Sequence, residues 1–301
     1  YRFGDQTFSV QSLLGAGEYG RVMRGTFGTR PVVIKMNVNV ELREDVNETI
    51  VQTRLHCFLR DNGHKQADVA RVPEAIFAAF VPGFGRVLGM EVAESSLLDS
   101  VERAPASSQI ALLRDALLRV CRLLIVLQRE FSFMHGDLHG ENVMTRGSDV
   151  YLIDFGMSSA RFKREPRMIT SGRYDGTRFH SQLDLLTLIT SLREDLGLSK
   201  HRQAAAWCDS YVGAFWTTVR EGLWSGRQVK LPFGARRMVR NATEEIKRSG
   251  EVYYAHHLLY EEIGRVSFPP CEPTNLLRLL QSDWKRKPPP PLMRERFFED
   301  V

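Results

Sequence analysis

The sequence predicts an α+β fold with a small antiparallel β-sheet at the N-terminal end and mostly helices after it. Short apolar segments separated by turn residues fill the first part of the chain, which is typical of strands. After about residue 95 the apolar residues follow the 3.6-residue period of helices instead. We therefore expect an N-terminal lobe over residues 1–93, a C-terminal lobe over residues 94–284 and a basic, proline-rich tail over residues 285–301.

In the N-terminal lobe, residues 1–37 contain short strands and turns. A helix containing Glu48 is expected next, because the apolar residues just beyond it would share one face. These residues are Ile50, Val51, Leu55 and Phe58. Further strands are expected around Ala75–Phe80 and Arg86–Val92. The lobe thus consists of strands with one helix inserted among them.

In the C-terminal lobe, Gln109–Glu130 predicts a long amphipathic helix. Its apolar stripe contains Ile110, Leu113, Leu117, Val120, Leu124 and Leu127. Further helices are expected over Trp207–Arg220 and Asn241–Glu262. The tail cannot continue a helix through Pro288–Pro291, so we expect an extended polyproline segment.

A glycine-rich pattern lies in the first expected hairpin. Leu14–Val22 contains the full pattern G-x-G-x-x-G-x-V. The same glycines occur in dinucleotide-binding folds, where a helix must open after the last Gly. Here Arg21–Phe27 is short, partly alternating and interrupted by Gly25, so it predicts a strand. This context favours a flap that covers phosphates.

A second motif has the residues that phosphoryl transfer needs. His135–Asn142 reads His-Gly-Asp-Leu-His-Gly-Glu-Asn, and Asp154-Phe155-Gly156 begins twelve residues after Asn142. In phosphoryl transfer from ATP, one carboxylate orients the acceptor hydroxyl. An amide oxygen and a second carboxylate hold Mg²⁺ on the phosphates. The order Asp137, Asn142, Asp154 supplies these groups at the required spacing.

Together these motifs resemble those of the protein kinase superfamily, from about residue 8 to about residue 195. The resemblance implies a bilobal fold with ATP and Mg²⁺ as cofactors. It implies that Lys35, which ends the apolar strand Val32–Lys35, binds the α- and β-phosphates and pairs with a Glu on the next helix. Of the candidates Glu41, Glu44 and Glu48, we favour Glu48 because of the apolar face beyond it; the alternative is a surface glutamate.

The same resemblance assigns the remaining site residues. Asp137 would be the catalytic carboxylate, and Asn142 and Asp154 would ligate Mg²⁺. His135 would pack under the Asp-Phe-Gly segment as a structural residue. Asp184 opens an otherwise apolar helix, so its carboxylate needs hydrogen-bond partners. It would stiffen the catalytic loop, unless it is only an acidic residue favoured at a helix N-terminus.

For the nucleotide, the resemblance implies that Val87–Leu97 forms the strand and hinge beside the adenine. Met90 would be the gatekeeper, and Glu91 and Ala93 would offer backbone groups to the purine edge. The remaining expected nucleotide contacts are Leu14, Gly15, Ala16, Gly17, Glu18, Tyr19, Gly20, Val22 and Val33. Each apolar member of this set has plain core packing as its alternative.

Three departures from the common kinase pattern bear on regulation and substrate. Gly136 replaces the Arg that usually binds a phosphorylated activation loop, so we expect activity without such phosphorylation. His139 replaces the usual Lys of Ser/Thr kinases, which is similar to aminoglycoside phosphotransferases and to atypical and viral protein kinases. No Ala-Pro-Glu follows Asp154-Phe155-Gly156, although Gly176-Thr177 resembles the Gly-Thr that precedes that motif.

The acceptor predicted from the sequence is a Ser or Thr hydroxyl of a protein. The glycine-rich loop, with Tyr19 at its tip, resembles that of protein kinases more than that of small-molecule kinases. The resemblance implies that Thr177 would be the threonine that touches the catalytic Asp in Ser/Thr kinases; the alternative is a turn residue. Six basic residues between 161 and 178 favour acidic or phosphorylated substrates, or RNA, unless they form only a solvated loop. They are Arg161, Lys163, Arg164, Arg167, Arg173 and Arg178. The alternatives are a small-molecule phosphotransferase and an inactive nucleotide-binding scaffold.

Composition limits the compartment and the partners. Cys57, Cys121, Cys208 and Cys271 are widely spaced without a C-x-x-C pair, which favours a reducing compartment and argues against a zinc site or a disulfide scaffold. We therefore expect an intracellular protein, cytoplasmic or nuclear. No apolar run approaches the ~20 residues of a transmembrane helix. The net charge of +5 is too small to indicate nucleic acid as a partner.

Overall fold

The computed structural model describes residues 2–3, 5–17, 20–37, 42–63, 68–81, 85–163, 169–170, 179–224 and 269–282. The chain divides into two compact units. Unit 1 comprises Tyr1–Ser100, Asp115–Asp137 and Glu141–Phe179, and unit 2 comprises Val101–Arg114, Leu138–Gly140 and His180–Val301. The lobe boundaries expected from the sequence stay a prediction. The expected helix at 241–262 and the tail at 285–301 lie outside the described residues.

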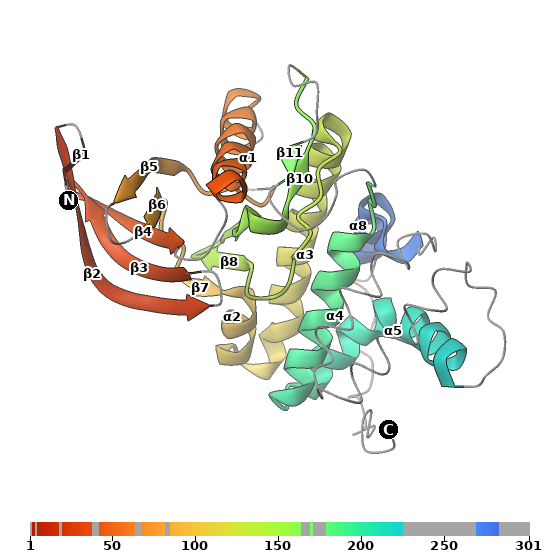
Figure 1. Cartoon of the computed structure of the whole chain (residues 1–301). Coiled ribbons are helices and arrows are strands. Elements are labelled where there is room, and N and C mark those ends of the chain that lie inside the picture. Colours follow the sequence, from red (N-terminus) through yellow and green to blue (C-terminus); the bar gives the residue numbers. More distant parts are fainter. Residues whose placement is uncertain are drawn as a thin grey trace. The chain divides into compact units, whose positions relative to one another are not determined.

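Unit 1 contains a six-stranded antiparallel sheet in the order β1-β2-β3-β4-β6-β5 (Figure 1). The strands are β1 Arg2–Phe3, β2 Gln6–Gly17, β3 Gly20–Phe27, β4 Arg30–Asn37, β5 Ala75–Val81 and β6 Gly85–Met90. Helix α1, Leu42–Asp61, lies between β4 and β5 in the chain and includes Glu48. An antiparallel sheet followed by helices confirms the predicted α+β fold.

Alternation along β4 explains the core of this sheet. Val32, Ile34 and Met36 are buried, while the residues between them are more exposed, so β4 turns one face to the core. Phe77 of β5 stacks on Phe8 and on Phe27, with ring centroids 5.0 and 4.9 Å apart. Burying a side chain of this size stabilises the fold by about 2 kcal/mol. One cluster of buried apolar side chains, with residues from β2 to β6, therefore stabilises the sheet.

Gly89 of β6 makes room for this aromatic cluster. A Cβ atom at Gly89 would lie 2.1 Å from the ring of Phe77, which is closer than any real contact.

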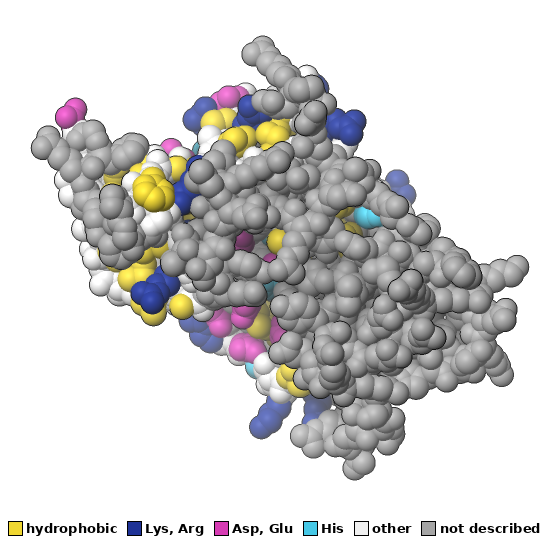
Figure 2. All heavy atoms as spheres, viewed as in Figure 1, with side chains coloured by type: hydrophobic (Ala, Val, Ile, Leu, Met, Phe, Trp, Pro, Cys, Tyr) yellow, Lys and Arg dark blue, Asp and Glu magenta, His cyan; other side chains and the backbone are white. Residues whose placement is uncertain are grey.

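Hydrophobic side chains also remain on the outside of the sheet, and Figure 2 shows yellow side chains over it on the face viewed. Phe80 is 72% exposed, and Leu13 and Leu14 are about half exposed.

A second, smaller sheet follows the first in unit 1. It has the order β7-β8-β9, from Ser95–Ser96, Val143–Arg146 and Asp149–Leu152. A short 3₁₀ helix, η1 at Phe155–Met157, follows β9. Strands β10 (Ser159–Ala160) and β11 (Ile169–Thr170) then pair with each other. The hairpin β8–β9 thus connects the segment after Asn142 to the segment before Asp154.

The helices bear out the expected periodicity. Helix α3 is Ala106–Phe131, and in its apolar stripe Leu113, Leu117, Val120, Leu124 and Leu127 are fully buried. The other helical elements are α2 Leu97–Arg103, α4 Leu183–Leu198, α5 Arg202–Trp224, η2 Pro269–Cys271 and α8 Pro273–Ser282. Helix α5 contains the helix predicted over Trp207–Arg220. Among the described residues, no helix is long and apolar enough to cross a membrane.

Candidate active site

Lys35 joins two carboxylates from distant parts of unit 1. Its Nζ lies 2.7 Å from Oε1 of Glu48 on α1 and 2.8 Å from Oδ1 of Asp154. The strand β4 carries the lysine, and the segment after β9 carries Asp154. The side chains of Lys35 and Glu48 are only 14% and 5% exposed. The structure therefore brings together the lysine, the favoured glutamate and the predicted metal-binding aspartate.

In this cluster, the positive charge of Lys35 and the negative charges of the two carboxylates stabilise one another. Burial alone would lower the pKa of Lys35, but the nearby charges of Glu48 and Asp154 outweigh burial and raise that pKa. Burial would likewise raise the pKa of Asp154, but the charge of Lys35 holds it below its ordinary value. The lysine is therefore charged and the aspartate ionised at neutral pH. Both are in the protonation states that phosphate and Mg²⁺ binding require.

Asp154 has an unusual backbone conformation that fixes its carboxylate. Its φ and ψ of 60° and 77° lie in the left-handed region, and its Oδ1 also accepts a hydrogen bond of 3.2 Å from the N–H of Gly156. His135 is fully buried against Phe155, with ring centroids 5.4 Å apart. Its Nε2 lies 2.9 Å from the carbonyl oxygen of Ile153. His135 thus packs beside the Asp-Phe-Gly segment, as a structural histidine would.

Asn142 links the two aspartates of the predicted site. Its Nδ2 donates a hydrogen bond of 2.8 Å to the carbonyl oxygen of Asp137. Its own carbonyl oxygen accepts a bond of 3.0 Å from the N–H of Ile153, next to Asp154. The loop with Asp137 and the strand end with Asp154 are therefore held to one residue. This bonding explains why an amide is suited to position 142 even before any ligand binds.

The donor set at Asn142 and Asp154 fits Mg²⁺. Because the amino group of Asn142 faces the carbonyl of Asp137, its Oδ1 lies on the other side of the amide. The side chain of Asp154 is 43% exposed. Carboxylate and amide oxygens are hard ligands of the kind that Mg²⁺ prefers. Among the described residues, no three or more His, Cys, Asp or Glu side chains group to hold a metal, so Mg²⁺ would also need phosphates and water.

In the predicted hinge, some backbone groups are hydrogen-bonded and two are not, among the described residues. The N–H of Glu91 is bonded to Glu74, the carbonyl of Val92 accepts from Arg146, and the N–H of Glu94 is bonded to Thr145. Among the described residues, no hydrogen bond is made by the carbonyl of Glu91 or the N–H of Ala93. These are the groups expected to face a purine edge. Their role stays a prediction.

The glycine-rich segment includes the end of β2 and the start of β3. Gly17 pairs with Gly20, and Gly15 pairs with Val22, while Glu18 and Tyr19 lie outside the described residues. Ala16 is in β2, and Leu14 is 49% exposed. In the neighbouring strand pairs, Val22 lies opposite Lys35 and Val33 lies opposite Met90. The predicted nucleotide contacts from these strands are thus adjacent to the lysine and to the predicted gatekeeper.

The remaining predicted residues belong to unit 2 or are not described. Asp184 lies in the first turn of α4 and is 1% exposed. His139 is partly buried, and the N–H of its neighbour Gly140 donates a 3.1 Å bond to Oγ of Ser191 on α4. Ser191 was not predicted from the sequence, because a serine within a helix has no distinguishing pattern. Thr177 and most of the basic segment, Arg164, Arg167, Arg173 and Arg178, lie outside the described residues.

Gly136 is required at the place where most kinases have Arg. Its φ of +79° is in the left-handed region, and a Cβ there would lie 2.3 Å from the carbonyl oxygen of Met157. We expect Gly136→Ala to destabilise unit 1 by more than about 2 kcal/mol in urea unfolding, since strain and clash add. Gly147→Ala is the matched control, because Gly147 has φ +58° but no atom within 4 Å of its Cβ position. Equal losses in the two variants would contradict a role for the Met157 contact.

Two comparisons with known proteins include the segments that carry these residues. The Phosphotransferase enzyme family (APH) matches residues 83–160, which include the hinge, the His135–Asn142 segment and Asp154. A probable bifunctional tRNA threonylcarbamoyladenosine biosynthesis protein of Methanothermobacter thermautotrophicus is 27% identical over 201 residues. That match covers 66% of this chain and 32% of the relative. The chain thus spans about a third of the relative's length.

The fold and these matches agree with each other. Residues 83–160 are similar to the Phosphotransferase enzyme family, and the antiparallel sheet followed by helices is consistent with a bilobal, kinase-like α+β fold. Its similarity to the archaeal relative is that of a distant homologue.

Proposed function

We propose that this protein transfers the γ-phosphoryl group of ATP, with Mg²⁺, to a Ser or Thr hydroxyl of a protein. The observation that carries the proposal is the position of Lys35 between Glu48 and Asp154, at 2.7 and 2.8 Å. A buried lysine held by one carboxylate, with a second and more exposed carboxylate beside it, supplies the charges that bind the phosphates and the metal.

The proposed reaction assigns one task to each residue. The acceptor oxygen attacks the γ-phosphorus, the bond from that phosphorus to the β,γ-bridging oxygen breaks, and the hydroxyl proton passes to the carboxylate of Asp137. Lys35 neutralises the α- and β-phosphates, and Glu48 fixes the direction of Lys35. Asn142 and Asp154 would hold Mg²⁺, which neutralises the charge that develops on the phosphates.

The second candidate is transfer to a small-molecule hydroxyl. The match of residues 83–160 to the Phosphotransferase enzyme family favours it, as does His139 in place of the usual lysine. Support for a protein acceptor comes from the glycine-rich segment and from the basic residues after the Asp-Phe-Gly segment. Of these, Arg161 and Lys163 are described and exposed. The proposal therefore includes a preference for acidic protein segments.

One assay tests the proposal and separates the two acceptors. Transfer of ³²P from Mg²⁺-ATP is measured with casein, a basic protein and an aminoglycoside panel in parallel, and Asp137→Ala gives the background. We expect labelled casein with the wild type and none with Asp137→Ala. Label only on a small molecule would establish the second candidate. Nucleotide binding without any transfer would indicate a binding scaffold and overturn the proposal.

A further inference from the structure

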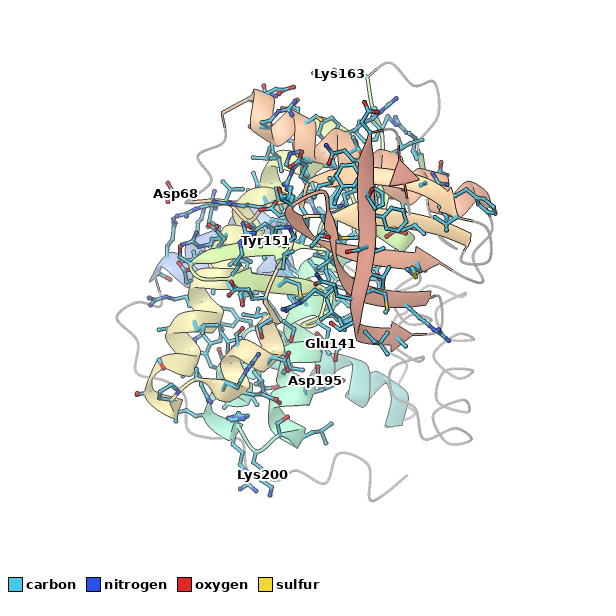
Figure 3. All side chains as sticks on the ribbon, turned by 90° about the vertical axis from the view of Figure 1, so that its left-hand side faces the viewer. Asp68, Glu141, Tyr151, Lys163, Asp195 and Lys200 are labelled. Carbon is cyan, nitrogen blue, oxygen red and sulfur yellow. The ribbon has the colours of Figure 1, made fainter. Side chains whose placement is uncertain are left out.

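A cluster of charged and aromatic side chains holds the hinge to the hairpin β8–β9. Nη2 of Arg146 donates to Oε1 of Glu91 at 2.6 Å and to the hydroxyl of Tyr151 at 2.6 Å. The Tyr151 hydroxyl in turn donates to the same Glu91 oxygen at 3.2 Å. Glu91 is the first hinge residue after Met90, so its side chain is tied to two residues of one hairpin. Figure 3 labels Tyr151 on this hairpin.

The cluster is rigid at its centre. Tyr151 is fully buried, and the guanidinium groups of Arg71 and Arg146 lie 5.7 and 5.3 Å from its ring centroid. Arg71 is itself fixed by an ion pair of 2.8 Å to Asp149. A cation against an aromatic face is attracted by the ring, and more strongly where water is excluded. The groups that hold Glu91 therefore have little freedom to move.

Arg146 also binds the hinge backbone directly. Its Nη1 donates a bond of 2.9 Å to the carbonyl oxygen of Val92. Val92 lies between Glu91 and Ala93, the two residues whose carbonyl and N–H make no bond among the described residues. One guanidinium group thus fixes the side chain of Glu91 and the peptide that separates the two unbonded groups.

We propose that Arg146 is a positioning residue that sets the hinge for adenine and so determines the choice of ATP over GTP. This inference rests on the proposed function, since it needs a purine at the hinge. Adenine offers an amino donor at C6 and an acceptor at N1, which match the carbonyl of Glu91 and the N–H of Ala93. Guanine offers an acceptor at C6 and a donor at N1, so both contacts would be repulsive. A hinge fixed by Arg146 cannot move to relieve that mismatch.

The test replaces Arg146 with methionine, which keeps the length of the stem and removes the donors. The variant loses the hydrogen bonds that the charged guanidinium group makes to the hinge. We therefore expect the Kd and KM for ATP to rise about tenfold. The value of kcat should change less than threefold, and the ratio of kcat/KM for ATP to that for GTP should fall by about tenfold. Tyr151→Phe should act in the same direction, more weakly, because it keeps the ring and removes only the hydroxyl.

Arg122→Met is the matched control. Arg122 also donates to a backbone carbonyl of unit 1, that of Asp68 at 2.9 Å, but away from the hinge. Arg122→Met should leave unchanged the Kd for ATP and the ratio of kcat/KM for ATP to that for GTP. If Arg146→Met does not fold, Tyr151→Phe carries the test with the same readouts. Wild-type affinity and an unchanged nucleotide ratio in the hinge variants would overturn the inference while the proposed function stands.

Failure of the proposed function has a different signature. A wild-type protein that binds ATP but transfers nothing would overturn that function, and the Kd values would still test the hinge. A wild-type protein that binds no purine nucleotide would overturn both.

Discussion

Lys35→Met is expected to destabilise unit 1 by about 3–5 kcal/mol and to abolish the proposed phosphoryl transfer. The loss of stability follows from Glu48, whose side chain is 5% exposed and would remain charged and buried after its cation is removed. Removing one partner of a buried ion pair costs far more than the pair itself contributes, because the remaining charge has lost both water and its counter-ion. Urea unfolding of the wild type and the variant measures this difference.

A second substitution separates stability from catalysis. Lys35→Met with Glu48→Gln removes the uncompensated charge, so the double variant should recover most of the lost stability and none of the activity. Arg30→Met is the matched control, since the Arg30–Glu74 pair has the same 2.7 Å separation but is 47% and 41% exposed. Breaking that exposed pair should cost less than about 1 kcal/mol. A single Lys35→Met variant as stable as Arg30→Met would show that the buried pair does not act as described.

The pairing of Lys35 with Glu48 was predicted because the resemblance to protein kinases implies a glutamate on the next helix, and local patterns then selected Glu48 among the candidates. Lysine ends an apolar strand, and the apolar residues after Glu48 define which side of the helix is buried. The bond from Lys35 to Asp154 was not predicted. It spans 119 positions and depends on the left-handed backbone at Asp154, which no composition pattern encodes.

The hinge cluster shows where sequence analysis fails more completely. Arg71, Arg146 and Tyr151 belong to no motif, and Glu91 was predicted only to offer a backbone group of the hinge. Each residue alone is an ordinary surface charge or core aromatic. Only the pairing of β8 with β9, and of Arg71 with Tyr151 in an isolated bridge, brings them together. Register between distant segments is a tertiary property, so this cluster had to be found in the structure.

Fold class was easier to predict than domain organisation for the same reason. The alternation of buried and more exposed residues along β4 and the apolar stripe of α3 are both local sequence patterns. Both are present in the structure. The division into compact units cuts through α3, because its first residues belong to unit 2 and its later ones to unit 1. No composition change near residue 115 marks that division.

Asp137→Asn is expected to lower kcat by about 1,000-fold and to leave the affinity for ATP within a few-fold of the wild type. In the proposed reaction this carboxylate orients the acceptor hydroxyl and takes its proton, a task that contributes about 10²–10⁴-fold in enzymes generally. Single-turnover transfer from Mg²⁺-ATP measures the chemical step, and calorimetric titration measures binding.

Retention of binding follows from how the loop is held. Asn142 donates to the backbone carbonyl of Asp137, so the change from Asp to Asn leaves that bond in place. Lys35, Glu48 and Asp154 are unaltered in the same variant. Asp115→Asn is the matched control, because Asp115 pairs with Arg119 on α3 and its side chain is 58% exposed. Its kcat should equal that of the wild type. If Asp137→Asn kept more than a tenth of the activity, another group would take the proton. If it lost ATP binding, Asp137 would instead be a residue that supports the loop.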